Sequence, residues 1–227
     1  MVIYDQDPWE SFIDEGTTLG SYEALTSKLN IRRFFVTSIW WSNFLDSRGF
    51  NSQFIQMGIS SNFLPTELDL EKRRHDLLFQ GTLHPYRASF FKECKSIGLD
   101  VKVLESTSYS TYLSNLREAS FHIHVGHPKW SIGNSFHDPN CCWIKDLEAV
   151  SQGCISLRNF ETEYHSLELH KIPAIATWKT IDEIPEIIDE IKRDPQLHRQ
   201  KVSESVNIIK NSFNWKQMGE CLAKLMD

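Results

Sequence analysis

The hydrophobic positions of the chain switch repeatedly between the two-residue alternation of a strand and the three- or four-residue spacing of a helix. Residues 76–80 form a short apolar run that ends at Gly81, and an apolar stripe with a three-residue period follows at 88–97. The clearest helical spacing starts at Tyr109, and residues 121–125 alternate as a strand does. Repeated strand–helix units of this kind predict an α/β fold with mainly parallel sheets flanked by helices.

The same pattern continues along the rest of the chain. Thr180 and Glu183 stand three residues apart ahead of an apolar stripe, which is the spacing of a capping box and predicts the start of a helix. Residues 126–142 follow neither period, so we expect an irregular stretch there. The further elements expected are a helix around Glu148, strands at 154–157 and 173–177, and helices that start near residues 181, 195 and 214.

The first 60 residues show a shorter version of this alternation. The strands expected there lie at 2–4, 33–37 and 54–57, and the helices at 22–29 and 39–47. This βαβαβ order corresponds to about half of a Rossmann-like domain. Polar and charged composition around Pro65 then predicts a linker. We therefore expect an abbreviated N-terminal lobe at 1–66, a linker at 67–76 and a C-terminal lobe at 77–227.

Composition narrows the class of protein without indicating a function. Of the 227 residues, 41% are hydrophobic and 24% are charged, which is usual for a globular domain. The net charge is -6 and no basic run alternates with aromatic residues, so we expect no nucleic-acid partner. No apolar run reaches the roughly 18–20 residues that cross a bilayer, and the first residues lack the pattern of a secretory signal. We therefore expect a cytoplasmic protein.

The five cysteines favour reduced thiols over a disulfide framework. Two of them, Cys141 and Cys142, are adjacent, and the total is odd. The Cys and His residues do not have the spacing of a structural zinc site, so we expect no metal centre built from them.

Two segments carry the candidate chemistry. In Lys145–Leu157, a short helix that bears Glu148 ends at Gly153 and leads directly into an apolar strand. In Gly81–Arg87, a glycine follows a strand and a helix opens at Pro85. Glycine lets the backbone approach a ligand closely, and a helix N-terminus favours phosphate groups.

Both segments resemble GT-B glycosyltransferases of the large "glycosyl transferases group 1" type. The opening Tyr4–Trp9 and the phrase Val36–Trp41 are closer to the branch that includes spore-maturation and rhamnosyltransferase-like proteins. The resemblance covers residues 76–227 and only the second half of a standard acceptor lobe. It implies a Rossmann-like GT-B architecture whose N-terminal lobe is truncated.

In this family, the loop after the first strand of the C-terminal lobe has the pattern G-R-L-x-x-x-K, and its basic residues hold the donor diphosphate. Gly81 matches the glycine, Arg87 stands at the lysine, and Thr82 replaces the arginine, so one positive charge is missing. An arginine can hold phosphate oxygens bidentately. The resemblance therefore implies a diphosphate site at this loop, to which Lys145 adds a cation one helical turn before Glu148.

The family also carries a pair of glutamates eight positions apart. Glu148 matches the later one, which binds the ribose hydroxyls, whereas Asn140 stands where the earlier, sugar-side glutamate is expected. Tyr109 lies in the region where the family cradles the base. Asp7, shortly after the first strand, is the candidate on the acceptor side. The polar loop at 126–142 is expected to meet the donor sugar and its phosphates.

The implied activity is sugar transfer from a nucleotide-sugar, such as a UDP-sugar, to a glycan, a lipid-linked acceptor or a small molecule. Such enzymes need no metal and no further cofactor, and we expect a retaining hexosyl- or deoxyhexosyltransferase of glycan biosynthesis. Arg87 would stabilise the charge that develops on the departing diphosphate. Asp7 and Asn140 are the other catalytic candidates implied by the resemblance.

Several alternatives stay open. Asp5 and Asp7 imitate the D-x-D of metal-dependent GT-A enzymes, although that motif normally follows a complete nucleotide-binding half. A short first lobe also suits a non-catalytic nucleotide-sugar-binding module, or one subunit of a split glycosyltransferase. A homodimer or a partner subunit could bury the aromatic Trp9, Phe12, Trp40 and Trp41, although packing in a core would account for them equally well. A lipid-linked acceptor would bring peripheral contact with a membrane.

Overall fold

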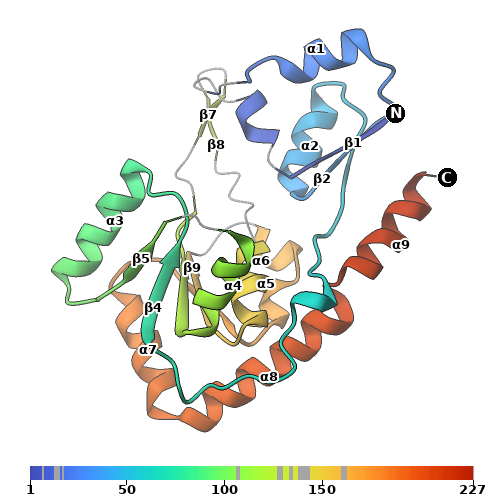
Figure 1. Ribbon diagram of the computed structural model, residues 1–227. Coiled ribbons are helices and arrows are strands. Elements are labelled where there is room, and N and C mark those ends of the chain that lie inside the picture. The colour runs from blue at the N-terminus through green and yellow to red at the C-terminus, as the bar shows by residue number, and fades with distance from the viewer. Residues whose placement is uncertain are drawn as a thin grey trace. The chain divides into compact units, whose positions relative to one another are not determined.

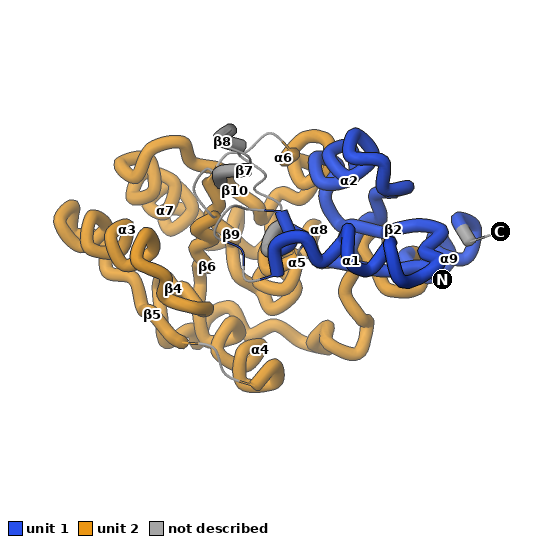
Figure 2. Tube along the Cα trace, turned by 90° about the horizontal axis from the view of Figure 1, so that it is seen from above, with its two compact units in different colours: residues 1–57, 127–141, 218–227 blue, residues 58–126, 142–217 orange. Residues whose placement is uncertain are grey.

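The computed structural model describes residues 1–6, 8–12, 16, 18–105, 108–126, 130–132, 135–137, 144–159 and 163–226. The chain clusters into two compact units, which are coloured separately in Figure 2. Unit 1 comprises residues 1–57, 127–141 and 218–227, and unit 2 comprises residues 58–126 and 142–217. The lobe boundaries expected at residues 66 and 77 stay predictions.

Unit 2 contains a parallel sheet in the order β10-β9-β6-β4-β5 (Figure 1). Counted along the chain, this is the doubly wound order in which the first strand has the second on one side and the third on the other. The direction of winding therefore reverses between β4 and β6, and open α/β sheets bind ligands beyond the carboxyl ends of strands at such a point. The strands are β4 (His75–Gln80), β5 (Lys102–Leu104), β6 (Ala119–His124), β9 (Ile155–Asn159) and β10 (Ile175–Trp178).

Helices cover this sheet, and α4 and α5 pack on β6, while α8 packs on α5 and α7 on β10. A cluster of small and branched apolar side chains from β4, α4 and α5, including Leu78, Leu116 and Ala149, fills the space beneath α4 and α5. The helices of unit 2 are α3 (Pro85–Ser96), α4 (Tyr109–Arg117), α5 (Ile144–Ser151), α6 (Glu163–Ser166), α7 (Glu183–Arg193) and α8 (Pro195–Ser212), with 3₁₀ helices η2 (Ser61–Phe63) and η3 (Leu169–Lys171). The last helix, α9 (Trp215–Met226), begins in unit 2 and continues into unit 1.

The helix starts follow local chemistry. Pro85 opens α3, where its missing N–H removes one of the donors that a first turn leaves unbonded. Asp194 caps α8, and its carboxylate accepts hydrogen bonds from the next two free amides at 3.0 Å each. The capping box expected at Thr180 and Glu183 takes a different form, because α7 begins at Glu183 itself. The Glu183 carboxylate accepts from the Lys179 amide at 2.9 Å and from the Thr180 hydroxyl at 3.4 Å.

The polar segment before β4 is anchored to unit 2 by Arg73. Its guanidinium donates to the carbonyls of Leu116, Ala119 and Gln152 at 3.1–3.2 Å, and also to the Arg117 carbonyl. These carbonyls lie at the ends of α4 and α5, where helices leave acceptors without an intrahelical partner. Arg73 therefore donates hydrogen bonds to carbonyls at the C-terminal ends of both α4 and α5.

Unit 1 contains a parallel three-stranded sheet in the order β1-β2-β3 and, separately, an antiparallel pair. The last strand of this sheet spans residues 52–54 and not the expected 54–57. At its start the Asp46 carboxylate accepts a hydrogen bond from the Ser52 amide at 2.9 Å. The elements are β1 (Val2–Asp5), η1 (Pro8–Ser11), α1 (Ser21–Lys28), β2 (Arg33–Val36), α2 (Ile39–Ser47), β3 (Ser52–Phe54), β7 (Trp130–Ile132) and β8 (Ser135–His137).

The antiparallel pair of β7 and β8 lies inside the stretch expected to be irregular, so that expectation is wrong for residues 130–132 and 135–137. Each strand has only three residues, which is too short for an alternating pattern to stand out from the sequence.

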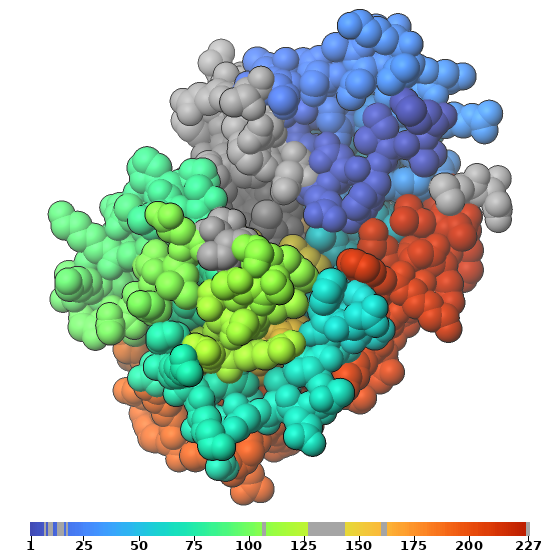
Figure 3. All heavy atoms as spheres, viewed as in Figure 1, coloured from blue at the N-terminus to red at the C-terminus, as the bar shows by residue number. Residues whose placement is uncertain are grey.

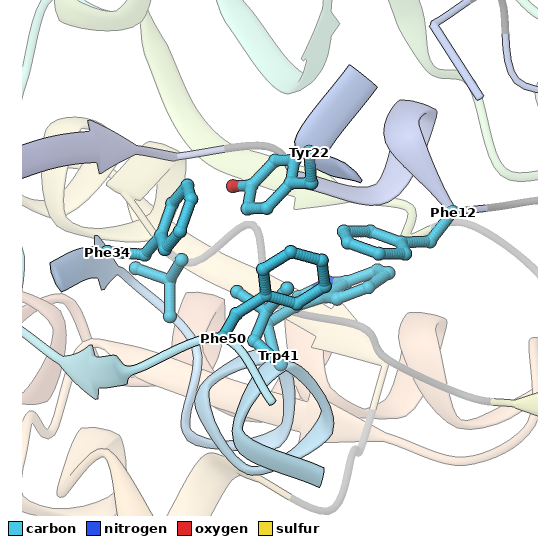
Figure 4. Packing of buried hydrophobic residues seen from close by; sticks show 7 residues of the cluster. Phe12, Tyr22, Phe34, Trp41 and Phe50 are labelled. Atoms are coloured by element: carbon cyan, nitrogen blue, oxygen red, sulfur yellow. The ribbon is translucent and has the colours of Figure 1, made fainter. Parts of the chain in front are cut away.

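An aromatic cluster forms the core of unit 1 (Figure 4). Tyr22 stacks on Phe34 with ring centroids 4.6 Å apart, and Phe50 meets both rings edge-on. Trp41 has no exposed surface and lies 5.9 Å from the Phe12 ring, so these two aromatic residues serve the core of the unit. Among the described residues, no helix is both long and apolar enough to cross a membrane.

Candidate functional site

The carboxyl ends of β4 and β6, where the winding of the sheet reverses, enclose a small cavity of about 40 Å³. Its walls come from β4, β6, the first turn of α3 and the first turn of α5. The lining residues are Phe79, Gln80, Arg87, His122, Ile123, His124, Val125 and Lys145.

Gly81 and Lys145, both expected at the phosphate site, lie together at this edge of the sheet. Gly81 has a φ of +154°, and a Cβ placed on it would lie 3.1 Å from Lys145 Nζ. A side chain at position 81 would therefore meet the ammonium group, and its backbone conformation is one that favours glycine. The arrangement brings a cation directly over the backbone that follows β4.

Arg87 borders the cavity, but its guanidinium is already engaged. Nη1 donates to the Thr82 carbonyl at 2.8 Å, while Nε and Nη2 donate to the Val125 carbonyl at 3.3 and 3.2 Å. The rings of Phe79 and Tyr86 lie 5.3 and 5.2 Å from the guanidinium carbon. In this conformation Arg87 links the ends of β4 and β6, and a phosphate would have to replace its carbonyl partners.

Glu148 and Tyr109 come together although 39 residues separate them. The Tyr109 hydroxyl donates to Glu148 Oε1 at 2.9 Å, and the carboxylate is buried. Burial raises the pKa of Glu148, against the opposing effects of the Tyr109 and Tyr112 hydroxyls and of Lys145. Burial, and then the neighbouring Glu148, raise the pKa of Tyr109. Glu148 is therefore a buried carboxylate that accepts a hydrogen bond from the half-exposed phenol of Tyr109.

The Tyr109 ring belongs to an aromatic surface that continues beyond α4. Phe63 meets Tyr109 with centroids 4.9 Å apart, and Trp215 meets Phe63 at 5.9 Å. In Figure 3 the atoms of α4 lie next to those of the 58–75 segment on this face of unit 2. Trp215 is 56% exposed and Tyr109 is 42% exposed, and of these two rings Tyr109 contacts Glu148 through its hydroxyl.

A buried polar network, which sequence reasoning missed, lies beneath α5. Asp146 projects from the first turn of α5 onto a square of four side chains on β6 and β9, where His122 pairs with Ser156 and His124 with Arg158. Its carboxylate forms an ion pair with Arg158 and accepts from Ser156 Oγ at 2.6 Å. His124 Nδ1 lies 3.1 Å from Asp146 Oδ2, and His122 Nδ1 lies 3.5 Å from Ser156 Oγ.

The charges of this network follow from burial and pairing. Burial opposes ionisation of Asp146, but Arg158, His124 and Ser156 together hold its pKa below its usual range. Burial lowers the pKa of His122 to about 3 and also lowers that of His124. Near neutral pH the network therefore contains an ionised carboxylate, a guanidinium and two neutral imidazoles. The only sequence signal was the pair of histidines in an otherwise apolar strand.

Several other expected site residues are not among those that the structure describes. Asp7 and Asn140 lie outside the described residues, as do His127, Lys129 and Asn134 of the loop. Asp5 lies in unit 1, where it accepts from the Tyr22 hydroxyl at 2.8 Å. Within the described residues, no group of three or more His, Cys, Asp or Glu side chains is arranged to hold a metal ion.

No protein-family model matches the sequence, and no curated protein matches it. Solved structures do match. Sucrose-phosphate synthase from Thermosynechococcus elongatus matches over 87% of this chain and 58% of its own, with a TM-score of 0.59 and 12% identity. Anabaena HepE in complex with UDP-glucose matches over 86% and 64%, with a TM-score of 0.62 and 13% identity. A mutant of S. aureus TarM, solved with UDP, fondaparinux and α-GlcNAc-glycerol, matches over 95% and 48%, with a TM-score of 0.62 and 12% identity.

These similarities define the fold. The chain has the Rossmann-like α/β fold of the GT-B structures, which confirms the fold class predicted from the sequence. The chain spans between 48% and 64% of the length of these structures. The particular branch of the family and the truncation of the first lobe stay predictions.

Proposed function

We propose that this chain is a glycosyltransferase that binds a nucleotide-sugar donor at the carboxyl edge of the unit 2 sheet. The observation that carries the proposal is the convergence of Gly81, Lys145, Glu148 and Tyr109 at one edge, from three separate segments. That edge includes the reversal point where doubly wound sheets bind ligands. Structures of the same fold have been solved with UDP-glucose and with UDP.

The proposed roles follow from charge and geometry. Lys145, above the backbone of Gly81, would neutralise the diphosphate together with the N-terminus of α3. The Glu148 carboxylate would accept hydrogen bonds from the two ribose hydroxyls, and the ring of Tyr109 would lie beside the base. Arg87 would join the diphosphate by exchanging a carbonyl partner for a phosphate oxygen, since guanidinium–phosphate hydrogen bonds are charge-assisted.

The chemistry proposed is transfer without a metal or another cofactor, with retention at the anomeric carbon. Positioning of the donor and stabilisation of the departing diphosphate would supply the rate enhancement. Asp7 and Asn140 remain the proposed acceptor-side and sugar-side residues. The acceptor class proposed is a glycan, a lipid-linked saccharide or a small molecule, in the cytoplasm, and the donor sugar a hexose or deoxyhexose.

A second candidate function is donor binding without complete catalysis. It is favoured by Arg87, whose guanidinium donates to the Thr82 and Val125 carbonyls and is therefore not available to a diphosphate in this conformation. In that case another copy or a different subunit would supply the rest of the acceptor site.

Titration calorimetry with UDP, GDP, dTDP and their common sugar conjugates tests the donor site. We expect one base to bind, and Lys145→Ala and Glu148→Gln each to weaken binding by about 10-fold or more, as expected for lost hydrogen bonds to charged groups. Lys95→Ala and Glu93→Gln, at exposed positions late in α3, are the matched controls and should bind as the parent does. Absence of binding by every nucleotide would overturn the proposal. Release of free or transferred sugar from the bound donor would distinguish the transferase from a donor-binding module.

A further inference from the structure

The cavity at the end of β6 has a directional hydrogen-bond pattern that limits what can enter it. An ionised Asp146 can only accept hydrogen bonds, so the Nδ1 atom of His124, 3.1 Å away, must carry its proton. A neutral imidazole with a proton on Nδ1 has a lone pair on Nε2. His124 also lines the cavity, so this ring presents an acceptor there.

The tautomer of His122 is fixed in the same way, with Ser156 between its ring and Asp146. The Ser156 hydroxyl donates to Asp146 at 2.6 Å, so its oxygen is left to accept. His122 Nδ1, at 3.5 Å from that oxygen, is then the donor, and its Nε2 is again the acceptor. The nearby ammonium of Lys145 further disfavours a second proton on either ring. Both histidines therefore present lone pairs to the same cavity.

Two properties of the cavity select its occupant. The cations Lys145 and Arg87 in its lining attract anions, whereas the lone pairs of the two imidazoles repel phosphate oxygens and accept hydrogen bonds from hydroxyl groups. The cavity is small, about 40 Å³, and partly open, so a hydroxyl-bearing arm of a ligand held at Lys145 can enter it. A ligand that places its diphosphate at Lys145 and one hydroxyl-bearing arm in the cavity would satisfy both the ammonium group and the imidazole acceptors.

We propose that His124 is a specificity-determining residue of the donor site, whose Nε2 accepts a hydrogen bond from one hydroxyl group of the donor sugar. The proposal rests on the nucleotide-sugar site described above. Asp146, held by Arg158, is the positioning residue that fixes the ring and its tautomer. Preference for the sugar-bearing form of the donor would then depend on His124, whereas affinity for the nucleotide alone would not.

The substitution His124→Asn distinguishes the affinity for the sugar-bearing donor from the affinity for the nucleotide alone. The asparagine amide can take the place of Nδ1 and still donate to Asp146, but it has no atom at the position of Nε2. We expect the affinity for UDP, or for whichever nucleotide the titrations select, to stay within about twofold, and that for its glucose conjugate to fall about 3- to 10-fold. Lys95→Ala, at an exposed position late in α3, is the control, because it changes neither the cavity lining nor the hydrogen bonds of Asp146. It should leave the ratio of the two affinities unchanged.

The outcomes distinguish this inference from the proposed function. Nucleotide binding with an unchanged ratio in His124→Asn, or an equal loss of affinity for both ligands, would overturn the role of His124 and leave the donor site intact. Binding of no nucleotide at all would overturn both. A second measurement needs no ligand: ¹⁵N-detected imidazole spectra should show His124 and His122 as neutral rings with the proton on Nδ1, and a proton on Nε2 of His124 would also overturn the inference.

Discussion

Among single residues, Asp146 has the most demanding environment in the described chain, because its carboxylate has no exposed surface and pairs with an equally buried Arg158. Removing both charges from water costs several kcal/mol per ion, and the cost is offset only when hydrogen bonds satisfy the remaining lone pairs. Ser156 and His124 provide these bonds. Since the pKa of Asp146 is lowered on folding, its contribution to stability is present above the usual range of an aspartate and is lost as the pH falls through the lowered value.

We expect Asp146→Asn to lower the free energy of unfolding by about 3–5 kcal/mol, because Arg158 would keep its charge in a dry site without a counterion. Urea denaturation followed by circular dichroism measures the change. Asp76→Asn is the control, since Asp76 pairs with Lys192 at 3.0 Å on the surface and is 73% exposed. The control should change stability by less than about 1 kcal/mol. Equal effects of the two substitutions would contradict the buried ion pair.

The pKa of Glu148 is shifted in the opposite direction, which predicts a pH dependence of donor binding. Burial raises this pKa, so as the pH falls the carboxylate loses its charge earlier than an exposed glutamate would. The protonated form accepts fewer hydrogen bonds from ribose. We expect nucleotide affinity, measured by titration calorimetry, to decrease as the pH falls through the raised pKa of Glu148, at a higher pH than an exposed glutamate would give. Glu148→Gln should flatten the profile, and a profile unchanged by this substitution would contradict the assignment.

At the scale of elements, the sequence predicted helices and strands that are defined by their own hydrophobic spacing. It did not show which helix covers which face of a strand. The helix expected at 39–47 has those bounds, since Ser38 caps it and Gly49 follows it. The alternation at 121–125 correctly predicted a strand, but it could not show that α5 covers the face carrying His122 and His124. The charges that make this burial stable come from Asp146 and Arg158, which are distant in the sequence.

The segment before β4 shows the same limit. Its basic residues were expected to lie in a solvated linker, whereas Arg73 donates to four carbonyls at the ends of α4 and α5 and just beyond them. Gly153 is required beside it, because a Cβ there would collide with the guanidinium, and its φ is +92°. Sequence pattern does not reveal which of two adjacent arginines turns inward.

Arg73 and its neighbour Arg74 give a matched test of this anchor. We expect Arg73→Ala to lower the free energy of unfolding by about 2–4 kcal/mol, because several carbonyls would lose a charged donor. Arg74 is 74% exposed and pairs with Glu118 at 3.5 Å, so Arg74→Ala should cost less than about 1 kcal/mol. Chemical denaturation of both variants measures the difference. A similar small loss in both would show that Arg73 is not an anchor.

For the whole molecule, the division into two units predicts which unit nucleotide binding should stabilise. Every described residue of the candidate donor site lies in unit 2, whereas unit 1 has an aromatic core of its own. The two segments that carried the sequence resemblance, 81–87 and 145–157, are brought to one edge of the unit 2 sheet by its doubly wound order. The sugar-side and acceptor-side candidates, Asn140 and Asp7, lie outside the described residues.

Hydrogen exchange in the presence of nucleotide tests this assignment across the full chain. Ligands stabilise the conformation that binds them, so exchange slows where local opening would release the ligand. We expect slower exchange at 81–87 and in α5, and unchanged exchange in α1 of unit 1. At a nucleotide concentration about 100 times the Kd, the stabilisation of the binding conformation is ~2.7 kcal/mol, which slows exchange by about 100-fold where opening requires release. Lys145→Ala, if it weakens binding about 10-fold, should reduce this protection from about 100-fold to about 10-fold at the same concentration. Protection of α1 without protection at 81–87 would place the nucleotide elsewhere.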